Sequence, residues 1–420
     1  MRIAIVGTGI AGMTAAHYLH PDHDITVFEQ NDYIGGHANT VVVREAQREL
    51  ALDTGFLVYN ERTYPTFTRL LRKLAVATQP SEMSFSVRCR RCRVEYCGHS
   101  VRGLFARTDQ LFRPRFHRML FEIWRFNRAG SNWLRAPHRG ESTVGSFLTN
   151  RGFSREFIRH YVTPMASAVW SSTTADVERF PLEFFLRFFD NHGMLSISDH
   201  PRWRTVTGGS REYVAALTRP FANRIRLCCP VRLIRRAPTG VELGFDDGQR
   251  AVFDKVVIAT HSSQALRMLA DPSAGEAGAL GALRYQANEA VLHTDVRMLP
   301  GNRRAWASWN YHMDDCERVE APLPMTYYLN RLQGLNARSH YCVTLNDRGG
   351  IARDTIIRRI TYEHPLYTVA SLGAQRQLQE LNGQRHTYYC GAYLGHGFHE
   401  DGARSGLSVA RSVEASREAA

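Results

Sequence analysis

The chain has 420 residues, 44% of them hydrophobic and 22% charged, which is an ordinary globular composition and long enough for two domains. No run of about 18 uninterrupted apolar residues is present, so we predict no membrane-spanning helix, and the apolar N-terminus lacks the successive regions of a signal peptide. The net charge of +13 favours anionic partners such as acidic lipid, and no motif indicates nucleic-acid binding. We therefore expect a cytoplasmic protein.

The first predicted elements form a dinucleotide-binding unit. Residues 2–6 are typical of a buried parallel strand, and apolar residues at helical spacing follow over 13–19. Between them, Gly7 permits a tight turn, Gly9 lets the backbone approach a pyrophosphate, and Gly12 lets helix and strand pack closely. The helix N-terminus, with the backbone of Ile10 and Ala11, then faces the phosphates with its free N–H groups.

A second strand is predicted over 24–28, and it ends at Glu29. A carboxylate at this place can accept hydrogen bonds from a ribose 2′-hydroxyl and would repel a 2′-phosphate. Up to this point the sequence fits FAD and NAD equally well.

The next segments are predicted to be a helix over 64–74 and a hairpin whose strands alternate over 84–87 and 94–96. Cys89 and Cys92 lie in this hairpin and, with Cys97, could hold zinc. They lack a second matching pair, so we expect no metal site. Residues 102–139 carry nine arginines among many aromatic residues. This segment is either a basic helix lying on an anionic membrane surface or a core-facing helix with solvated arginines.

Further along the chain we predict strands over 230–234 and 254–260, a loop over 271–278, and sheet segments over 305–311 and 325–329. A last strand enters the glycine-rich segment 391–406, and a helix leaves it from about Asp401. The N-terminus of that helix can stabilise negative charge that develops on a bound group.

Several motifs together resemble the flavin amine oxidase and phytoene desaturase superfamily. Within it, they look like a branch of bacterial FAD-dependent oxidoreductases associated with cyclopropane-fatty-acid synthases. The double glycine Gly35-Gly36 after Glu29 resembles the extended FAD signature, which usually continues with arginine where this chain has His37. The other motifs lie at 53–56, 164–171, 191–193, 203–210, 330–333, 364–365 and 397–402.

The resemblance implies a two-dinucleotide-binding-domain flavoprotein: an α/β, Rossmann-like FAD-binding domain with an interleaved α+β substrate domain. We place the FAD domain at 1–58, 200–275 and 385–420, and the substrate domain at 59–199 and 276–384. The implied FAD-binding residues are Gly7, Gly9, Ile10, Ala11, Gly12, Glu29, Gly35, Gly36, His37, Val231, Ala259, Gly391, Asp401 and Gly402. The residue that matches Val231 contacts the adenine through its backbone.

The resemblance also indicates the reactive end of the site. Phe398 matches one wall of an aromatic cage, His399 is a candidate base or hydrogen-bond donor, and His192 is a candidate for the substrate cavity. Amine oxidases of the superfamily often keep a lysine near flavin N5. The only lysines here, Lys73 and Lys255, lie outside any such motif.

The leading hypothesis is therefore an FAD-dependent dehydrogenase or desaturase that acts on a fatty-acyl or other lipid substrate by hydride transfer to flavin N5. One alternative is a flavin amine oxidase that uses oxygen. Another is a non-catalytic flavoprotein that supports a lipid methyltransferase. Expected partners are a small-molecule or lipid substrate, a cyclopropane-fatty-acid-synthase-type protein, and the inner face of the membrane through residues 102–139.

Overall fold

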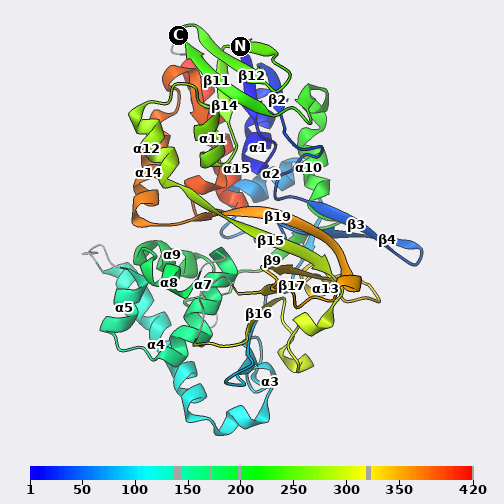
Figure 1. Cartoon of the computed structure of the whole chain (residues 1–420), viewed down its shortest axis with the longest axis vertical. Coiled ribbons are helices and arrows are strands. Elements are labelled where there is room, and N and C mark those ends of the chain that lie inside the picture. The colour runs from blue at the N-terminus through cyan, green and yellow to red at the C-terminus, as the bar shows by residue number, and fades with distance from the viewer. Residues whose placement is uncertain (137–142, 171–172, 197–199, 318–322, 419–420) are drawn as a thin grey trace.

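A computed structural model describes the chain except for residues 137–142, 171–172, 197–199, 318–322 and 419–420. Ser171 and residues 137–139, which belong to segments discussed above, lie outside the described part. The described chain forms two lobes, with both termini in one lobe and the long strands β15 (Arg284–His293) and β19 (Ile356–Leu366) between the lobes (Figure 1). Among the described residues, no helix combines the length and the apolar character that crossing a bilayer requires.

A five-stranded parallel sheet forms the centre of the first lobe, in the order β10-β2-β1-β14-β20. Its strands are β1 (Arg2–Val6), β2 (Asp24–Phe28), β10 (Ile225–Arg226), β14 (Lys255–Ile258) and β20 (Thr387–Tyr389). The sheet confirms the strands predicted over 2–6, 24–28 and 254–260. It joins segments from the beginning, the middle and the end of the sequence.

Both faces of this sheet are covered, which explains why its strands are apolar throughout. Ile3 and Ile5 pack on one side in the same cluster as residues of α1 (Ile10–Leu19) and α15 (His399–Glu418). Ala4 and Val6 pack on the other side with a three-stranded antiparallel sheet and three helices. Those elements are β11 (Val231–Ala237), β12 (Gly240–Phe245), β13 (Arg250–Phe253), α11 (Ser262–Met268), α12 (Ala274–Ala282) and α14 (Val369–Leu381).

The second lobe contains a seven-stranded mixed sheet in the order β19-β15-β18-β17-β16-β7-β8. Besides β15 and β19 it comprises β18 (Cys342–Leu345), β17 (Met325–Tyr328), β16 (Trp309–Met313), β7 (Phe85–Cys89) and β8 (Glu95–Cys97). The antiparallel pair β7–β8 confirms the predicted hairpin, and its parallel pairing with β16 joins the two inserted parts of the chain in one sheet.

Helices cover one side of this second lobe (Figure 1). They are α3 (Val101–Leu104), α4 (Pro114–Arg135), α5 (Val144–Asn150), α6 (Arg155–Phe157), α7 (Thr163–Trp170), α8 (Thr174–Arg179) and α9 (Leu182–Asn191). Within the arginine-rich segment, α4 packs an aromatic face into the core and leaves other rings exposed, and the membrane contact stays a prediction. It buries Phe116, Met119 and Phe126, whereas Phe121 and Trp124 are exposed.

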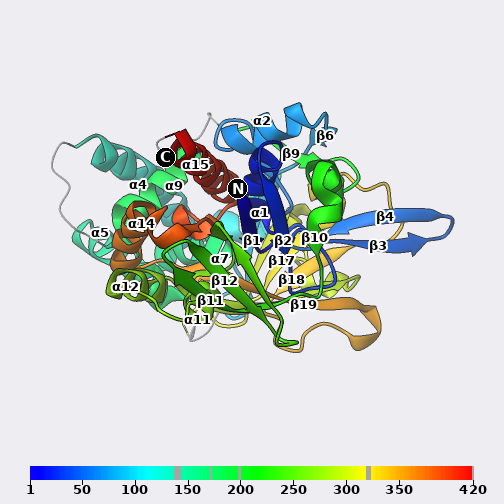
Figure 2. The ribbon, with the colours of Figure 1, turned by 90° about the horizontal axis from the view of Figure 1, so that it is seen from above.

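The remaining elements are short. They are α2 (Pro65–Lys73), α10 (Arg211–Thr218), α13 (Leu329–Leu332), the hairpin β3 (Thr40–Glu45) and β4 (Arg48–Asp53), and a small sheet of β5 (Tyr59–Asn60), β9 (Trp203–Val206) and β6 (Thr78–Pro80). The β3–β4 hairpin extends away from the rest of the chain in both views (Figure 1 and Figure 2). α2 confirms the helix predicted over 64–74. The division of the chain into two domains at particular residues stays a prediction.

One local prediction is wrong, and another is confirmed only in part. The segment 271–278, predicted as a loop from its Pro and Gly content, contains the start of α12. Ser273 caps this helix, because its hydroxyl accepts from Glu276 N at 3.2 Å while its own N–H donates to the Glu276 carboxylate at 2.7 Å. In the predicted strand 305–311, regular pairing begins only at Trp309, since residues 303–305 form a 3₁₀ turn capped by Asn302.

Glu276 also anchors α12 to the sheets. Its carboxylate accepts from Arg236 Nη1 at 2.8 Å and from Tyr389 Oη at 2.6 Å, and the side chains of Arg236 and Glu276 are both buried. A buried carboxylate that loses its cationic partner is strongly destabilising.

We expect Arg236→Met to lower the free energy of unfolding by about 3 kcal/mol, because it leaves Glu276 buried without its cation. The neighbouring Arg235→Met is the matched control, because Arg235 is exposed and its loose pair with the half-buried Glu242 should change stability by less than about 1 kcal/mol. Urea denaturation of the two variants measures the difference. An equal decrease in the free energy of unfolding in the two variants would show that the buried Arg236–Glu276 pair contributes no more to stability than the exposed arginine does.

Candidate cofactor site

The glycine turn after β1 has the geometry that phosphate binding requires. Gly7 has φ +104°, and a Cβ on Gly12 would lie 2.0 Å from Gly7 O, so neither position accepts a side chain. A Cβ on Gly9 would have no atom within 4 Å. The N-cap residue of α1 is Gly9, which has no side chain to cap the helix, so within the described part of the chain the backbone N–H groups of Ile10 and Ala11 are left to receive an anion.

Glu29 is fixed at the end of β2. Its carboxylate accepts from Thr8 N at 3.0 Å and from Asn31 Nδ2 at 2.9 Å, so it is tied to the glycine turn itself. The backbone of Cys229 donates to Glu29 O at 2.8 Å. This contact places the start of β11, and with it Val231, beside the position predicted for the ribose and adenine.

The second glycine pair packs directly on the first turn. Gly35 N donates to Thr8 O at 3.2 Å, and Gly36 adopts φ +59°. A Cβ on Gly36 would lie 3.2 Å from Gly9 Cα, so the two turns form one continuous surface. His37 follows these two glycines in the chain and comes directly after this surface.

His37 belongs to a group of aromatic rings, most of them half-buried. Its ring stacks on that of Tyr362 with their centroids 4.9 Å apart. The centroids of the His364 and His261 rings lie 5.8 and 6.2 Å away. Burial, followed by the neighbouring histidines, holds the pKa of His37 well below its usual value. His37 is therefore neutral near pH 7 and does not replace the positive charge of the family's arginine.

The C-terminal segment closes the site from the other side. A Cβ on Gly402 would lie 2.6 Å from Ile10 Cγ2, so α15 is in close contact with the N-terminus of α1. Gly391 follows β20, and its N–H donates to Ser405 Oγ at 3.0 Å. Ala259, at the end of β14, donates to Val6 O at 2.8 Å. These contacts gather the predicted cofactor-binding residues at the carboxyl ends of the parallel strands, where ligands bind in such sheets.

The two acidic residues at the start of α15 hold the backbone. Asp401 accepts from His396 N at 2.9 Å and from Phe398 N at 3.1 Å, and so shapes the loop that carries Phe398. Glu400 accepts from Thr66 N and Phe67 N at 3.0 and 2.9 Å, and thereby caps α2 rather than its own helix. Burial raises the pKa of Asp401, and also that of Glu400.

The structure brings two of the three predicted catalytic residues together. The ring of Phe188 in α9 stacks on the rings of His192 and Phe398, with centroid distances of 3.9 and 5.1 Å. The ring centroid of Trp203 lies 5.9 Å from that of His192. Burial lowers the pKa of His192 to about 4. We call Phe188, His192, Trp203 and Phe398 the aromatic wall.

His399 is placed in a different group. Its ring stacks on Phe56 at 3.7 Å, and its Nε2 lies 2.9 Å from Tyr213 Oη. Burial lowers the pKa of His399 to about 3, so the ring is neutral near pH 7. These contacts give His399 a packing role in addition to the catalytic role predicted for it, which stays a prediction.

Both lysines are engaged away from the aromatic wall. Lys255 Nζ donates to Ser416 Oγ at 2.7 Å and to Tyr388 Oη at 3.1 Å. Lys73 Nζ lies over the ring of Tyr18, 4.9 Å from its centroid. Both contacts agree with the sequence analysis, which found neither lysine in a motif that would place it near flavin N5.

The residues present fit FAD. Besides the open space at Gly9, the buried Tyr367 Oη has no partner in the described chain and would lie 2.8 Å from a Cβ on Gly397, at the loop before α15. A surface pocket of about 490 Å³ lies against Gly208 and Gly209, and it is lined by none of the predicted cofactor residues.

Sequence reasoning missed several residues that build this site, among them Phe188, Tyr213 and Tyr362. Phe188 lies in an aromatic-rich helical run and Tyr362 in an alternating strand, patterns that indicate only burial. No local signal distinguishes them from ordinary core residues.

Comparisons with known proteins agree with this geometry. Residues 10–298 match the family described as flavin containing amine oxidoreductase. No curated protein matches the sequence. Among solved structures, a CLA-producing fatty acid isomerase from P. acnes is 17% identical, with 98% of both chains covered and a TM-score of 0.69.

Two amine oxidases are similar to the same extent. Cyclohexylamine oxidase from Brevibacterium oxydans is 14% identical over 98% of this chain and 99% of its own, with a TM-score of 0.68. Putrescine oxidase bound to putrescine is 12% identical over 99% of both chains, also with a TM-score of 0.68. At these identities the similarity establishes the fold.

The two glycines of the phosphate turn should respond differently to alanine. Gly9→Ala should weaken FAD binding at least tenfold while leaving the stability of the cofactor-free protein within about 0.5 kcal/mol, because its Cβ meets only open space. Gly12→Ala should weaken FAD binding and also lower the stability of the cofactor-free protein, because its Cβ overlaps Gly7 O. Flavin titration and thermal unfolding of cofactor-free protein measure the two effects. Unchanged FAD affinity in Gly9→Ala would contradict the site.

His399 should make the fold acid-sensitive. Its folded pKa of about 3 lies below the ordinary value of 6.5, so the stability it contributes is present above pH 6.5 and is lost as the pH falls towards 3. His399→Gln, which can still bond Tyr213, should flatten the fall in unfolding free energy between pH 6 and 4 by up to about 1.4 kcal/mol per pH unit. The exposed His99→Gln is the control. If the unfolding free energies of wild type and His399→Gln fell in parallel between pH 6 and 4, the lowered pKa of His399 would be refuted.

Proposed function

Because the chain belongs to the family of flavin containing amine oxidoreductases, we propose that it is a dehydrogenase or desaturase of a fatty-acyl or other lipid substrate. Membership of the family makes the protein an FAD-dependent oxidoreductase. The lipid substrate and the hydride transfer are our proposal.

The observation that carries the proposal is the chemical character of the surroundings of Phe398. The aromatic wall consists of apolar rings and one neutral histidine. The nearest carboxylates in sequence, Glu400 and Asp401, are occupied by backbone N–H groups. Among the described residues, these two carboxylates are thus not free to receive a substrate ammonium group, whereas a hydrocarbon chain would find a matching surface.

Bound FAD supplies the two-electron chemistry, because it can accept a hydride from a C–H bond at N5. The aromatic wall would hold the acyl carbons and exclude water. His192 Nδ1 lies 2.9 Å from Phe188 O and is placed to donate to it, which leaves the lone pair on Nε2. In a desaturation, Nε2 of neutral His192 would accept the proton that leaves the neighbouring carbon.

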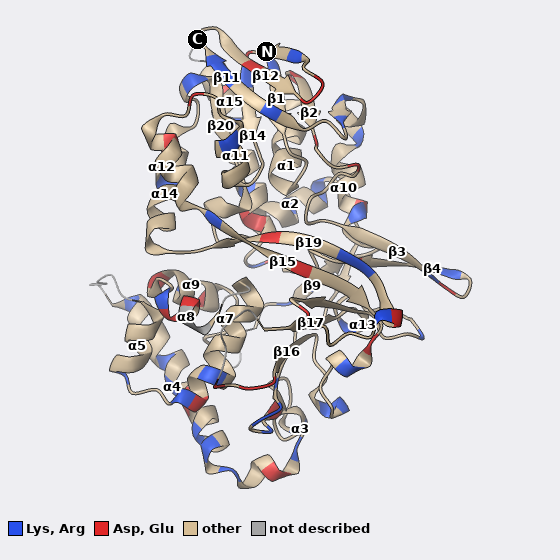
Figure 3. Cartoon of the chain, in the orientation of Figure 1, with Lys and Arg blue, Asp and Glu red and all other residues tan. Residues whose placement is uncertain are grey.

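The surface of α4 supports a membrane-derived substrate. Phe112 before this helix and Phe121 and Trp124 within it are exposed, Phe112 to 86%. Arginines follow the helix between them (Figure 3). Exposed aromatic rings beside arginines suit the interface of an anionic bilayer, so we propose peripheral membrane contact here. A cyclopropane-fatty-acid-synthase-type partner stays a prediction.

The solved structures that share the fold include proteins named for a fatty acid isomerase and for amine oxidases. They therefore leave both substrate classes open. The neutral surroundings of Phe398 favour the lipid.

The proposal is tested by following flavin absorbance in anaerobic solutions of the holoenzyme. We expect phospholipid or fatty-acyl substrates to bleach the flavin and simple amines to leave it oxidised. His192→Asn, which keeps a donor for Phe188 O but removes Nε2, should retain FAD and reduce at least tenfold more slowly.

Three results would overturn the proposal. Bleaching by amines alone, with rapid oxygen consumption, would identify an amine oxidase. Conversion of a lipid to an isomer without bleaching would identify an isomerase. No change in either lipid or flavin would exclude lipid oxidation.

A further inference from the structure

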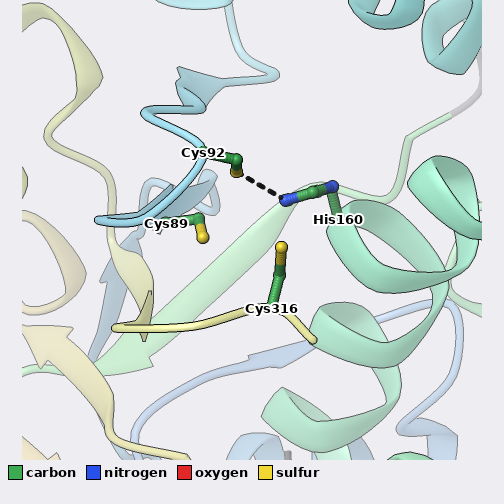
Figure 4. A group of neighbouring side chains, drawn as sticks. All are labelled: Cys89, Cys92, His160 and Cys316. Carbon is green, nitrogen blue, oxygen red and sulfur yellow. Dashed lines mark hydrogen bonds between the residues drawn. The ribbon is translucent and has the colours of Figure 1, made fainter. Parts of the chain in front are cut away.

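Three cysteines and a histidine from distant parts of the sequence meet inside the second lobe. The donor atoms of Cys89, Cys92, His160 and Cys316 all lie within 4.8 Å of one another (Figure 4). Cys89, His160 and Cys316 are buried, and Cys92 is half-buried. Figure 4 shows all four side chains pointing towards one common centre. Cys97, the third cysteine considered from the sequence, is not part of this group.

The imidazole of His160 is oriented as a metal ligand would be. Its Nδ1 lies 3.1 Å from Glu156 O, so the proton is placed on that nitrogen. Nε2 then carries the lone pair and points into the group, 3.1 Å from Cys92 Sγ. A histidine that donates one ring N–H to a backbone carbonyl and turns its other nitrogen towards the ligand group is the usual arrangement around bound metals.

The backbone around His160 is also specialised. Residues 158–162 form a π-helical turn between α6 and α7, and Tyr96 Oη donates to His160 O at 2.7 Å. Such turns are rare and occur frequently at functional sites. The turn carries the imidazole towards the β7–β8 hairpin.

The cysteines are held by backbone pairing. Cys89 ends β7 and lies opposite Met313 of β16, and Arg90 N donates to Met313 O at 2.9 Å. Arg91 N continues the pairing to Asp314 O at 3.0 Å, which carries the following segment with Cys316 alongside the hairpin turn. The turn closes at Arg93, whose φ is +58°. The pairing therefore holds the three thiols near one another without a disulfide between them.

The size and composition of the group match one ion. With Zn–S bonds of about 2.3 Å, the edges of a tetrahedral site are about 3.8 Å, so the group needs to contract by about 1 Å at most. Three thiolates and one imidazole are a ligand set of structural zinc, and soft sulfur ligands disfavour magnesium and calcium. Four protein ligands leave no open position for catalysis.

We propose that Cys89, Cys92, His160 and Cys316 bind one zinc ion that holds the second lobe together. The ion would join the β7–β8 hairpin, the helical region at α6–α7 and the segment after β16. The first and last of the four ligands, Cys89 and Cys316, are more than 200 residues apart in sequence. The zinc cross-link would therefore close a large loop of the chain. This proposal is independent of the substrate.

The test is the metal content of the purified, full-length holoenzyme, measured by mass spectrometry together with its flavin content. We expect about one zinc per chain in the wild type. Cys316→Ala and His160→Gln should lose most of it, whereas Cys342→Ala, which removes a buried cysteine of β18 outside the group, should keep it.

A second measurement does not depend on the variants folding. Zinc removed from the wild type by a chelator should lower the melting temperature, and added Co²⁺ should give the intense absorption of tetrahedral cobalt–thiolate coordination. The Cys342→Ala variant should give the same spectrum.

Several outcomes would overturn the proposal. One is wild-type protein from zinc-supplemented medium that contains no zinc and takes up no Co²⁺. Another is full zinc content in both Cys316→Ala and His160→Gln. A disulfide among the three cysteines in protein isolated without reductant would show a redox pair in place of a metal site.

Discussion

The close contact between the first and the last helix of the first lobe is the constraint on which the site depends. A Cβ on Gly402 would overlap Ile10, and one on Gly406 would lie 2.2 Å from Ala11 O. Because both positions are glycine, α15 lies directly against the N-terminal turn of α1. The same contact sets the distance between the phosphate-binding glycines and the loop that carries Phe398. Any side chain here would separate the two ends of the cofactor site.

Charges around the proposed reaction site are neutralised or used to hold the backbone. The half-buried histidines His37, His192 and His399 are neutral near pH 7, since desolvation lowers the pKa of each. The carboxylates of Glu400 and Asp401 accept from backbone N–H groups and so hold the loop and α2 in place. Such surroundings suit an uncharged substrate, whose C–H bond would give a hydride to flavin N5 in the proposed reaction, better than the binding of a cation.

The second lobe is built by pairing parts of the chain that are remote in sequence. Strand β7 comes from the first inserted part and pairs with β16 from the second. The group of Cys89, Cys92, His160 and Cys316 lies at this junction and reaches the helical region as well. A zinc ion there would fix the helical region at α6–α7 relative to the sheet of the second lobe.

The sequence by itself determined the strand, turn and helix of residues 2–19, the acidic end of β2 and the double glycine, because these features depend on local backbone geometry. It also predicted the β7–β8 hairpin and α2 from their periodicity. It failed at α12, where the capping pair Ser273 and Glu276 outweighs the Pro and Gly that indicate a loop. Only the tertiary structure placed Phe188 beside Phe398, and Cys316 and His160 beside Cys89. Contacts between segments so far apart leave no periodic trace in the sequence, because they are set by how the sheets and helices pack.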